Sequence, residues 1–542
     1  MRGLMMDEPL MISSLLEHAA AAHGSTAIVA RTSEGGLHRT TYGEALRRSK
    51  QLAQAMIALG MKPGDRVGSL AWNTHHHFEL FYGISGTGAV LHTINPRLFD
   101  EHIVYIINHA EDRWICVDAA PLPIAERLAP QLPGVQGWIY MSVDPEPPQS
   151  SLPGLMSYER LLAAQNGAYD WPSFDERQAS VICYTSGTTG QPKGVVNTHR
   201  STLLSALVMS TADMIGGYRS GARETYMPIA PLFHGNGWQM VYTAPLSGHK
   251  LVMPGRNFEP DKLHEIIAQE GVTVAAGVPT IWLTLVDYMD QKGLKLPSLR
   301  AALVAGTKPP RSLIEAMEGR YGIEVAQCWG MTEALGVTRC TMPPGAAEAP
   351  FDERVGHKLR QGRVAFTTRL RIVDDEGKIL PRDGKAFGHL QARGPMIAGA
   401  YLKQDAPTMD GWLQTGDVAR LFPDGTVEIV DRSKDVIKSG GEWISSAAVE
   451  NAAMGHPAVA QAAVIGIAHP RWQERPLLVV VRRPGKDVTS QELIEFLRPQ
   501  MASWWLPDDV TFIDQLPMTA TGKIHKVSLR ERFKDMVSVA AE

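Results

Sequence analysis

The feature that most constrains this chain is the run T-S-G-T-T-G-Q-P-K-G at residues 185–194. A strand-like segment at 180–184 precedes it, and a second strand-like segment begins at Gly194. Glycines permit positive φ and close backbone approach. Successive N–H groups can therefore form a nest for an anion, to which the hydroxyls add donors and Lys193 adds charge. We predict a polyphosphate-binding loop between two strands.

This loop differs from the Walker A loop of kinases and ATPases. A Walker A loop needs glycine directly before its lysine and Ser or Thr directly after it. Here Pro192 precedes Lys193 and Gly194 follows it, which disfavours a P-loop enzyme. An ordinary exposed glycine-rich turn would account for neither the proline nor the lysine.

Composition favours a protein that acts on small molecules. A chain of 542 residues exceeds what one hydrophobic core usually supports, so we expect at least two domains. The net charge of -4 gives no basic footprint for nucleic acid. The four cysteines are widely spaced without a C-x-x-C pair, which argues against a disulfide framework and a zinc cluster and favours a cytoplasmic setting.

We also expect neither a signal peptide nor a membrane span. The N-terminal segment reaches Asp7 and Glu8 before any apolar core develops. The uncharged run at 271–286 is short and is broken by Gly277 and Pro279, so it cannot comfortably cross a bilayer.

The hydrophobic pattern predicts α/β layers followed by two smaller units. Helix-like segments at 41–59, 78–89 and 311–321 alternate with strand-like segments at 66–70, 272–275 and 301–304. After Gly362 short strands with tight turns at 374–377 and 424–425 predict a β-subdomain. Helices at 445–454 and 490–501 and strands at 459–467 and 477–481 then follow, so we place a domain boundary close to Arg432.

Two further motifs suit a nucleotide. In the run Q-C-W-G-M-T-E at 327–333, Trp329 offers an aromatic face for a purine and Glu333 offers the hard oxygen that Mg²⁺ prefers. Asp417 could accept hydrogen bonds from two ribose hydroxyls, as acidic residues do in nucleotide sites. Taken alone, Trp329 would often be a core residue, and Asp417 a turn residue beside glycine.

These motifs, with P-x-T-x-x-G-K at 517–523, resemble those of the adenylate-forming enzymes: acyl-CoA synthetases, firefly luciferases and peptide-synthetase adenylation domains. The resemblance covers nearly the whole chain. It implies a large N-terminal domain at 1–431, with two α/β sheet layers and a small β-subdomain. A small mobile α+β C-terminal domain would span 432–542 and swing about a hinge near Lys434.

The resemblance also assigns roles to residues. Lys523, Thr185 and Glu333 would be catalytic, and Glu333 and Thr185 would hold Mg²⁺. The acyl group would contact His234, Trp238, Gly306 and Gly330. Trp329 replaces the family's tyrosine, and Lys308 replaces a usually small residue. ATP or AMP would be bound by Thr185, Ser186, Gly187, Thr188, Thr189, Lys193, Gly306, Thr307, Trp329, Gly330, Thr332, Glu333, Asp417, Arg432 and Lys523; coenzyme A would be bound by Lys438, Gly440, Gly441, Glu442, Trp443 and Glu474.

The implied activity is the joining of a small carboxylic acid to coenzyme A at the expense of ATP, through an acyl-adenylate. The segments at 440–445 and 472–476 look most like bacterial synthetases for short to medium chains. A subgroup that the chain resembles activates 3-methylmercaptopropionate, and medium-chain fatty acids are the alternative. A luciferase-like oxidase, a peptide-synthetase module and a non-catalytic nucleotide-binding protein are the rivals. Family members are often dimers, so a homodimer stays open.

The assignment of Lys523 predicts a split between two half-reactions. Lys523→Ala should abolish acid-dependent release of pyrophosphate, because the lysine offsets charge that develops during attack on the α-phosphate. The same variant should still form thioester from supplied acyl-adenylate and coenzyme A. Equal loss in the two assays would contradict this division of labour.

Overall fold

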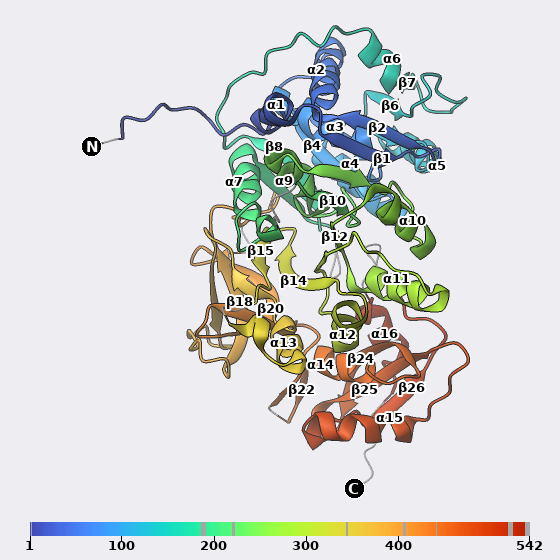
Figure 1. Cartoon of the computed structure of the whole chain (residues 1–542), viewed down its shortest axis with the longest axis vertical. Coiled ribbons are helices and arrows are strands. Elements are labelled where there is room, and N and C mark those ends of the chain that lie inside the picture. The colour runs from blue at the N-terminus through green and yellow to red at the C-terminus, as the bar shows by residue number, and fades with distance from the viewer. Residues whose placement is uncertain are drawn as a thin grey trace.

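The computed structural model describes residues 1, 3–185, 191–218, 223–342, 345–404, 408–440, 442–518 and 524–536. In Figure 1 the C-terminal domain lies at the opposite end of the molecule from helices α1 (Ile12–His23) and α2 (Tyr42–Ala58). Two stacked α/β layers and a β-subdomain make up the rest, as predicted.

The first α/β layer is a sheet with strand order β7-β6-β5-β3-β4-β8-β9. Its strands pair in parallel except β8 and β9, the antiparallel pair that flanks the predicted phosphate loop. Parallel strands covered on both faces are mostly apolar, and β4 is buried along its whole length, its polar residues His92 and Thr93 included. The strands are β3 (Arg66–Leu70), β4 (Val90–Ile94), β5 (Asp112–Asp118), β6 (Gly137–Met141), β7 (Met156–Ser157), β8 (Ala179–Tyr184) and β9 (Gly194–Thr198); the helices are α3 (His75–Gly83), α4 (Asp100–Ala110), α5 (Leu122–Leu128) and α6 (Tyr158–Ala163).

The second layer has strand order β2-β1-β11-β10-β12-β13-β14. It is parallel except for its edge strand β2. The strands are β1 (Ala27–Arg31), β2 (Leu37–Thr41), β10 (Thr225–Pro228), β11 (Lys250–Met253), β12 (Val274–Gly277), β13 (Ala301–Val304) and β14 (Glu324–Met331); the helices are α7 (His199–Met209), α8 (Gly235–Trp238), α9 (Met240–Ser247), α10 (Pro260–Glu270), α11 (Pro279–Lys292) and α12 (Arg311–Glu315).

Strand β14 joins this layer to the β-subdomain. Its first half pairs in parallel with β13, up to Gln327 opposite Val304. Its second half pairs antiparallel with β15, beginning with Cys328 opposite Arg339. The subdomain continues through β15 (Ala334–Arg339), β16 (Gly362–Val364), β17 (Arg369–Val373), β18 (Phe387–Arg393), β19 (Thr408–Met409), β20 (Trp412–Leu421) and β21 (Thr426–Arg432), with α13 (Phe351–Lys358) beside it.

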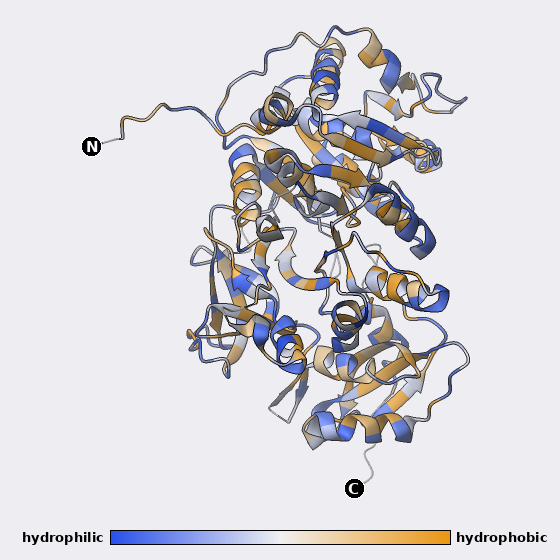
Figure 2. Cartoon of the chain, in the orientation of Figure 1, coloured by the Kyte–Doolittle hydropathy of each residue, from blue (hydrophilic) through white to orange (hydrophobic). Residues whose placement is uncertain are grey.

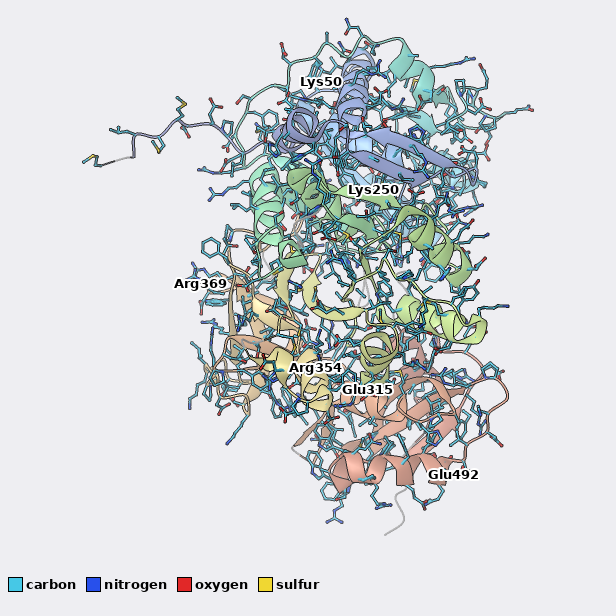
Figure 3. All side chains as sticks on the ribbon, viewed as in Figure 1. Lys50, Lys250, Glu315, Arg354, Arg369 and Glu492 are labelled. Atoms are coloured by element: carbon cyan, nitrogen blue, oxygen red, sulfur yellow. The ribbon has the colours of Figure 1, made fainter. Side chains whose placement is uncertain are left out.

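The C-terminal domain is an α+β unit with its own sheet, in the order β23-β22-β25-β24 with β26 beside β25. Apolar clusters cover both faces of this sheet. Figure 2 colours its central strands mostly orange and the outer helix α15 partly blue, and Figure 3 places Glu492 of that helix at the periphery. The elements are β22 (Ile437–Ser439), β23 (Glu442–Ile444), α14 (Ser446–Ala453), β24 (Val459–His469), β25 (Gln473–Arg482), α15 (Ser490–Leu497), β26 (Asp509–Phe512) and α16 (Lys526–Arg532).

The helix predicted at 78–89 differs in both bounds. It begins at His75, because the Thr74 side chain caps it by accepting a hydrogen bond from the His77 N–H. It ends at Gly83, after which a 3₁₀ turn closes on Gly88 with φ of 85°. A helical pattern that continues through Gly86 and Gly88 therefore overestimates the helix.

The segment predicted as a helix at 311–321 also changes form. It is α-helical over Arg311–Glu315 and then widens to a π-helix over Ala316–Arg320. In the part of the chain that the structure describes, no helix has both the length and the apolar character needed to cross a membrane.

Trp282 offers a test of the packing of the second layer. It is fully buried in α11, and its indole N–H donates to the Gly277 carbonyl at 3.1 Å. Trp282→Ala should destabilise the protein by about 3–5 kcal/mol, because it leaves a large cavity. Thermal unfolding measures the effect, with Trp504→Ala as control since Trp504 is 40% exposed. Equal shifts in the two variants would contradict the observed packing.

Candidate active site

A cavity of about 1200 Å³ lies between the two domains. Most of the predicted site residues that the structure describes line it, although they come from segments far apart in the chain. The residues concerned are Thr185, Lys193, His234, Trp238, Gly306, Thr307, Trp329, Gly330, Thr332, Glu333, Asp417, Arg432 and the predicted hinge residue Lys434. Pockets for one small ligand usually measure about 300–1,000 Å³, so this cavity has room for a nucleotide and an acid together.

Six predicted residues lie outside the described residues: Ser186, Gly187, Thr188, Thr189, Gly441 and Lys523. The described neighbours of Lys523 do line the cavity, namely Ile524 and His525. An isolated β-bridge joins Met518 to Ile524, and the His525 N–H donates to the Pro517 carbonyl at 2.7 Å.

The described ends of the predicted phosphate loop are held together. The Thr185 N–H donates to the Lys193 carbonyl at 2.9 Å, and the Lys193 N–H donates to Thr185 Oγ1 at 3.2 Å. The Leu402 N–H donates to the Gly194 carbonyl at 2.8 Å. A segment more than two hundred residues downstream therefore supports the base of the loop.

Tyr401 is a site residue that the sequence reasoning missed. Its hydroxyl donates to Glu333 Oε1 at 2.6 Å, and the Lys193 ammonium lies 5.0 Å from the centre of its ring. Burial and the bond to Glu333 raise the pKa of the Tyr401 phenol, so it stays a neutral donor. One signal in the sequence could have found it: Tyr401 is an aromatic residue directly after Gly399 and Ala400 in a loop.

Trp329 and Arg432 both hold the carboxylate of Asp417. The Trp329 indole N–H donates to Asp417 Oδ2 at 2.8 Å, and Arg432 Nε lies 2.9 Å from Asp417 Oδ1. Arg432 follows Asp417 by fifteen positions, and the two lie opposite each other on β20 and β21 of one hairpin. Each carboxylate oxygen keeps a lone pair for a further donor such as a ribose hydroxyl.

Lys308 also gains a structural role. Its ammonium pairs with Glu428 Oε1 at 2.9 Å and so ties the loop after β13 to β21.

Gly306 in the loop after β13 has φ of 94°, a conformation that favours glycine. A Cβ at Gly330 would lie 2.9 Å from the Ala334 carbonyl oxygen, so β14 and β15 can approach this closely only with glycine there.

Apolar side chains form one part of the cavity lining, which we call the apolar end. Its lining includes Met209, Ile215, Leu303 and Leu335 beside Trp238. Burial raises the pKa of the nearby Cys328 thiol to about 12, so it adds no charge. This end suits a hydrocarbon or thioether chain.

A left-handed turn presents Trp238 to the apolar end. Gly235 and Gly237 have positive φ, and so do Trp238 and Gln239, at 53° and 66°. Positive φ at a residue with a side chain costs about 1–3 kcal/mol. This cost is consistent with a fixed wall for the apolar end, where Trp238 was predicted.

The residues predicted to bind coenzyme A lie elsewhere. Lys438, Gly440, Trp443 and Glu474 are described but do not line the cavity. The Trp443 ring instead packs against Phe387 and His389 of the β-subdomain, with centroids 5.8 and 5.5 Å apart. The side chain of Glu442 is not among those described. These assignments stay predictions.

Known proteins match the chain over nearly its whole length. It is 45% identical to the 3-methylmercaptopropionyl-CoA ligase of Ruegeria lacuscaerulensis, covering 99% of this chain and all of the relative. It is 41% identical to the medium-chain-fatty-acid–CoA ligase of Ectopseudomonas oleovorans, covering 99% of this chain and 98% of the relative. Among solved structures, an anthranilate CoA ligase in complex with anthranoyl-AMP superposes with a TM-score of 0.84 over 97% of this chain and 98% of its own, at 24% identity.

Two family models match in the order that the domains require. The model of the AMP-binding enzyme family matches residues 15–402, and that of the AMP-binding enzyme C-terminal domain matches residues 448–523. The predicted boundary at 431/432 falls between them and stays a prediction. The match confirms the resemblance inferred from the motifs: this chain belongs to the AMP-binding enzyme family.

Proposed function

We propose that this protein is an acyl-CoA ligase that activates a short- to medium-chain acid, with 3-methylmercaptopropionate as its preferred substrate. One observation carries the proposal. A single cavity joins the charged cluster around Glu333 and Asp417 to an apolar end beside Trp238. A nucleotide and an apolar acid can therefore meet in it. The relatives named 3-methylmercaptopropionyl-CoA ligase and medium-chain-fatty-acid–CoA ligase support the choice of acid.

In the first half-reaction a carboxylate oxygen of the acid attacks the α-phosphorus of ATP. The bond to the bridging oxygen breaks, and pyrophosphate leaves with the electron pair. Lys193 and Thr185 would steady the departing phosphates, and Lys523 would offset the developing charge. Asp417 would hold the ribose, with the Trp329 ring against the adenine.

In the second half-reaction the coenzyme A thiol loses its proton, and its sulfur attacks the acyl carbon of the adenylate. The bond between the acyl carbon and the phosphate oxygen of AMP breaks, AMP leaves with the electron pair, and the thiol proton passes to solvent. Enclosure between the domains protects the reactive adenylate from water. A rotation about Lys434 would bring the hairpin of Gly440 and Trp443 toward the cavity for this step, replacing the segment of Ile524.

The donor set fits a magnesium ion. The Glu333 carboxylate lines the cavity, is 6% exposed and is oriented by Tyr401. Together with the Thr185 hydroxyl it offers the oxygen ligands that Mg²⁺ takes alongside substrate phosphates. When bound there, the ion would neutralise phosphate charge during transfer.

Trp329 tests the nucleotide half of the site. Trp329→Phe keeps an aromatic face but removes the donor to Asp417, so the KM for ATP should rise about ten-fold. The preference for ATP over 2′-deoxy-ATP should also fall, because the carboxylate that contacts the ribose loses its orientation. Steady-state kinetics with both nucleotides measure the change.

Trp412→Phe is the matched control for that variant. Trp412 lies on the same strand as Asp417 but does not line the cavity. Unchanged KM and unchanged nucleotide preference in Trp329→Phe would contradict the role given to the indole.

A panel of acids tests the substrate. AMP release with coenzyme A should show the highest kcat/KM for 3-methylmercaptopropionate, with hexanoate and octanoate next. Each methylene that the apolar end buries adds about 0.8 kcal/mol to binding, which should place hexanoate and octanoate above butyrate. The first rank of 3-methylmercaptopropionate follows instead from the similarity to the 3-methylmercaptopropionyl-CoA ligase. Benzoate should be poorer, because its rigid ring carries no flexible chain. A preference for benzoate would contradict the aliphatic assignment, and a preference for octanoate would favour the medium-chain alternative.

A further inference from the structure

Hydrogen bonds link the end of the N-terminal domain to the first helix of the C-terminal domain. Asp431 Oδ2 accepts from the Ser446 hydroxyl at 2.7 Å and from the Ala447 N–H at 3.2 Å. The Ser445 hydroxyl donates to the Val430 carbonyl at 2.7 Å. These contacts lie on the two sides of Lys434, the predicted hinge. The Asp431 carboxylate also faces the N-terminal end of α14, where the helix dipole favours negative charge.

Lys526 extends this chain of contacts to the segment that lines the cavity. Its ammonium donates to Ser446 Oγ at 2.6 Å and pairs with Glu450 Oε1 at 2.7 Å. Lys526 is the first residue of α16, directly after the stretch in which Ile524 bridges to Met518. It therefore anchors the described segment that directly follows the predicted catalytic lysine.

The network is largely buried, although Asp431, Glu450 and Lys526 also line the cavity. Asp431 is 5% exposed and Ser446 is fully buried. Burial opposes the charged form of Lys526, but the carboxylates of Glu450, Asp431 and Asp435 raise its pKa overall. Burial likewise raises the pKa of Glu450, against the opposing effect of Lys526. Removing one partner leaves another buried without its counter-charge, which is costly.

We propose that Asp431, Ser446 and Lys526 are positioning residues that hold the C-terminal domain in the arrangement required for adenylate formation. The proposal rests on the proposed ligase function. Asp431 directly precedes Arg432, which contacts Asp417, so the same strand end that shapes the nucleotide site also orients the C-terminal domain. Rotation about Lys434 would break the bonds across the hinge. Their stabilisation therefore belongs to this arrangement alone.

Two variants test the proposal through the separate half-reactions. Asp431→Asn weakens the acceptor at the hinge, and Lys526→Met removes the ammonium while keeping a long side chain. Each should slow acid-dependent exchange of pyrophosphate into ATP by about ten-fold or more, as expected for loss of a buried charged partner. Thioester formation from supplied acyl-adenylate should stay unchanged or become faster, because that step does not use this arrangement.

Controls separate positioning from folding. Lys534→Met makes the same substitution at an exposed lysine paired with Glu531, and it should change neither half-reaction. Ser446→Ala removes only the hydroxyl between Lys526 and Asp431, and should reproduce the selective loss where Lys526→Met impairs folding. Thermal unfolding identifies impaired variants.

The outcomes distinguish the two proposals. Selective loss of exchange supports the positioning role. Equal loss in both half-reactions by variants with unchanged unfolding midpoints would overturn it, and so would full exchange activity in Asp431→Asn and Ser446→Ala. If the unmodified protein exchanges no pyrophosphate with any acid, the ligase function itself fails.

Discussion

The site depends on one strand that belongs to two sheets. β14 pairs in parallel with β13 up to Gln327 and antiparallel with β15 from Cys328 onward. The register of the β15 pairing shifts between Trp329 and Met331, shortly after the strand has left the α/β layer. This change of partner brings Trp329 to Asp417 of the β-subdomain, 88 residues later in the chain. Without it the aromatic face and the carboxylate would lie in separate units.

Hydrogen bonds and an ion pair fix the orientation of three carboxylates that line the cavity. Glu333 is held by Tyr401, Asp417 by Trp329 and Arg432, and Asp431 by Ser446. Preorganised groups of this kind stabilise developing charge without reorganising during the reaction. The Trp329 contact links β14 to the β-subdomain, and the Ser446 contact links the β-subdomain to the C-terminal domain. The chemistry and the placement of the C-terminal domain therefore depend on neighbouring residues.

Local pattern predicted the layers, and the resemblance of the motifs assigned the site residues, most of which line the cavity where they are described. Motifs of this kind are recognisable because glycine-rich loops and acidic motifs keep their spacing within one segment. The separation of Asp417 and Arg432 along the sequence matches the register of a hairpin. The turn at Gly425 already indicated that hairpin. Contacts between distant segments carried no such signal. Tyr401 meets Glu333 across 68 residues, Lys308 meets Glu428 across 120, and Lys526 meets Ser446 across 80. The fold of the backbone determines which of the many lysines and tyrosines contacts each of these partners.

The central claim is that a carboxylate oxygen becomes bonded to the α-phosphorus of ATP in this cavity. An acid carrying ¹⁸O in both carboxylate oxygens, turned over with ATP and coenzyme A, tests it by mass spectrometry of the products. The account predicts one ¹⁸O in each AMP and none in pyrophosphate. Label in orthophosphate or pyrophosphate, with unlabelled AMP, would mean that a different phosphorus is attacked and would contradict the account.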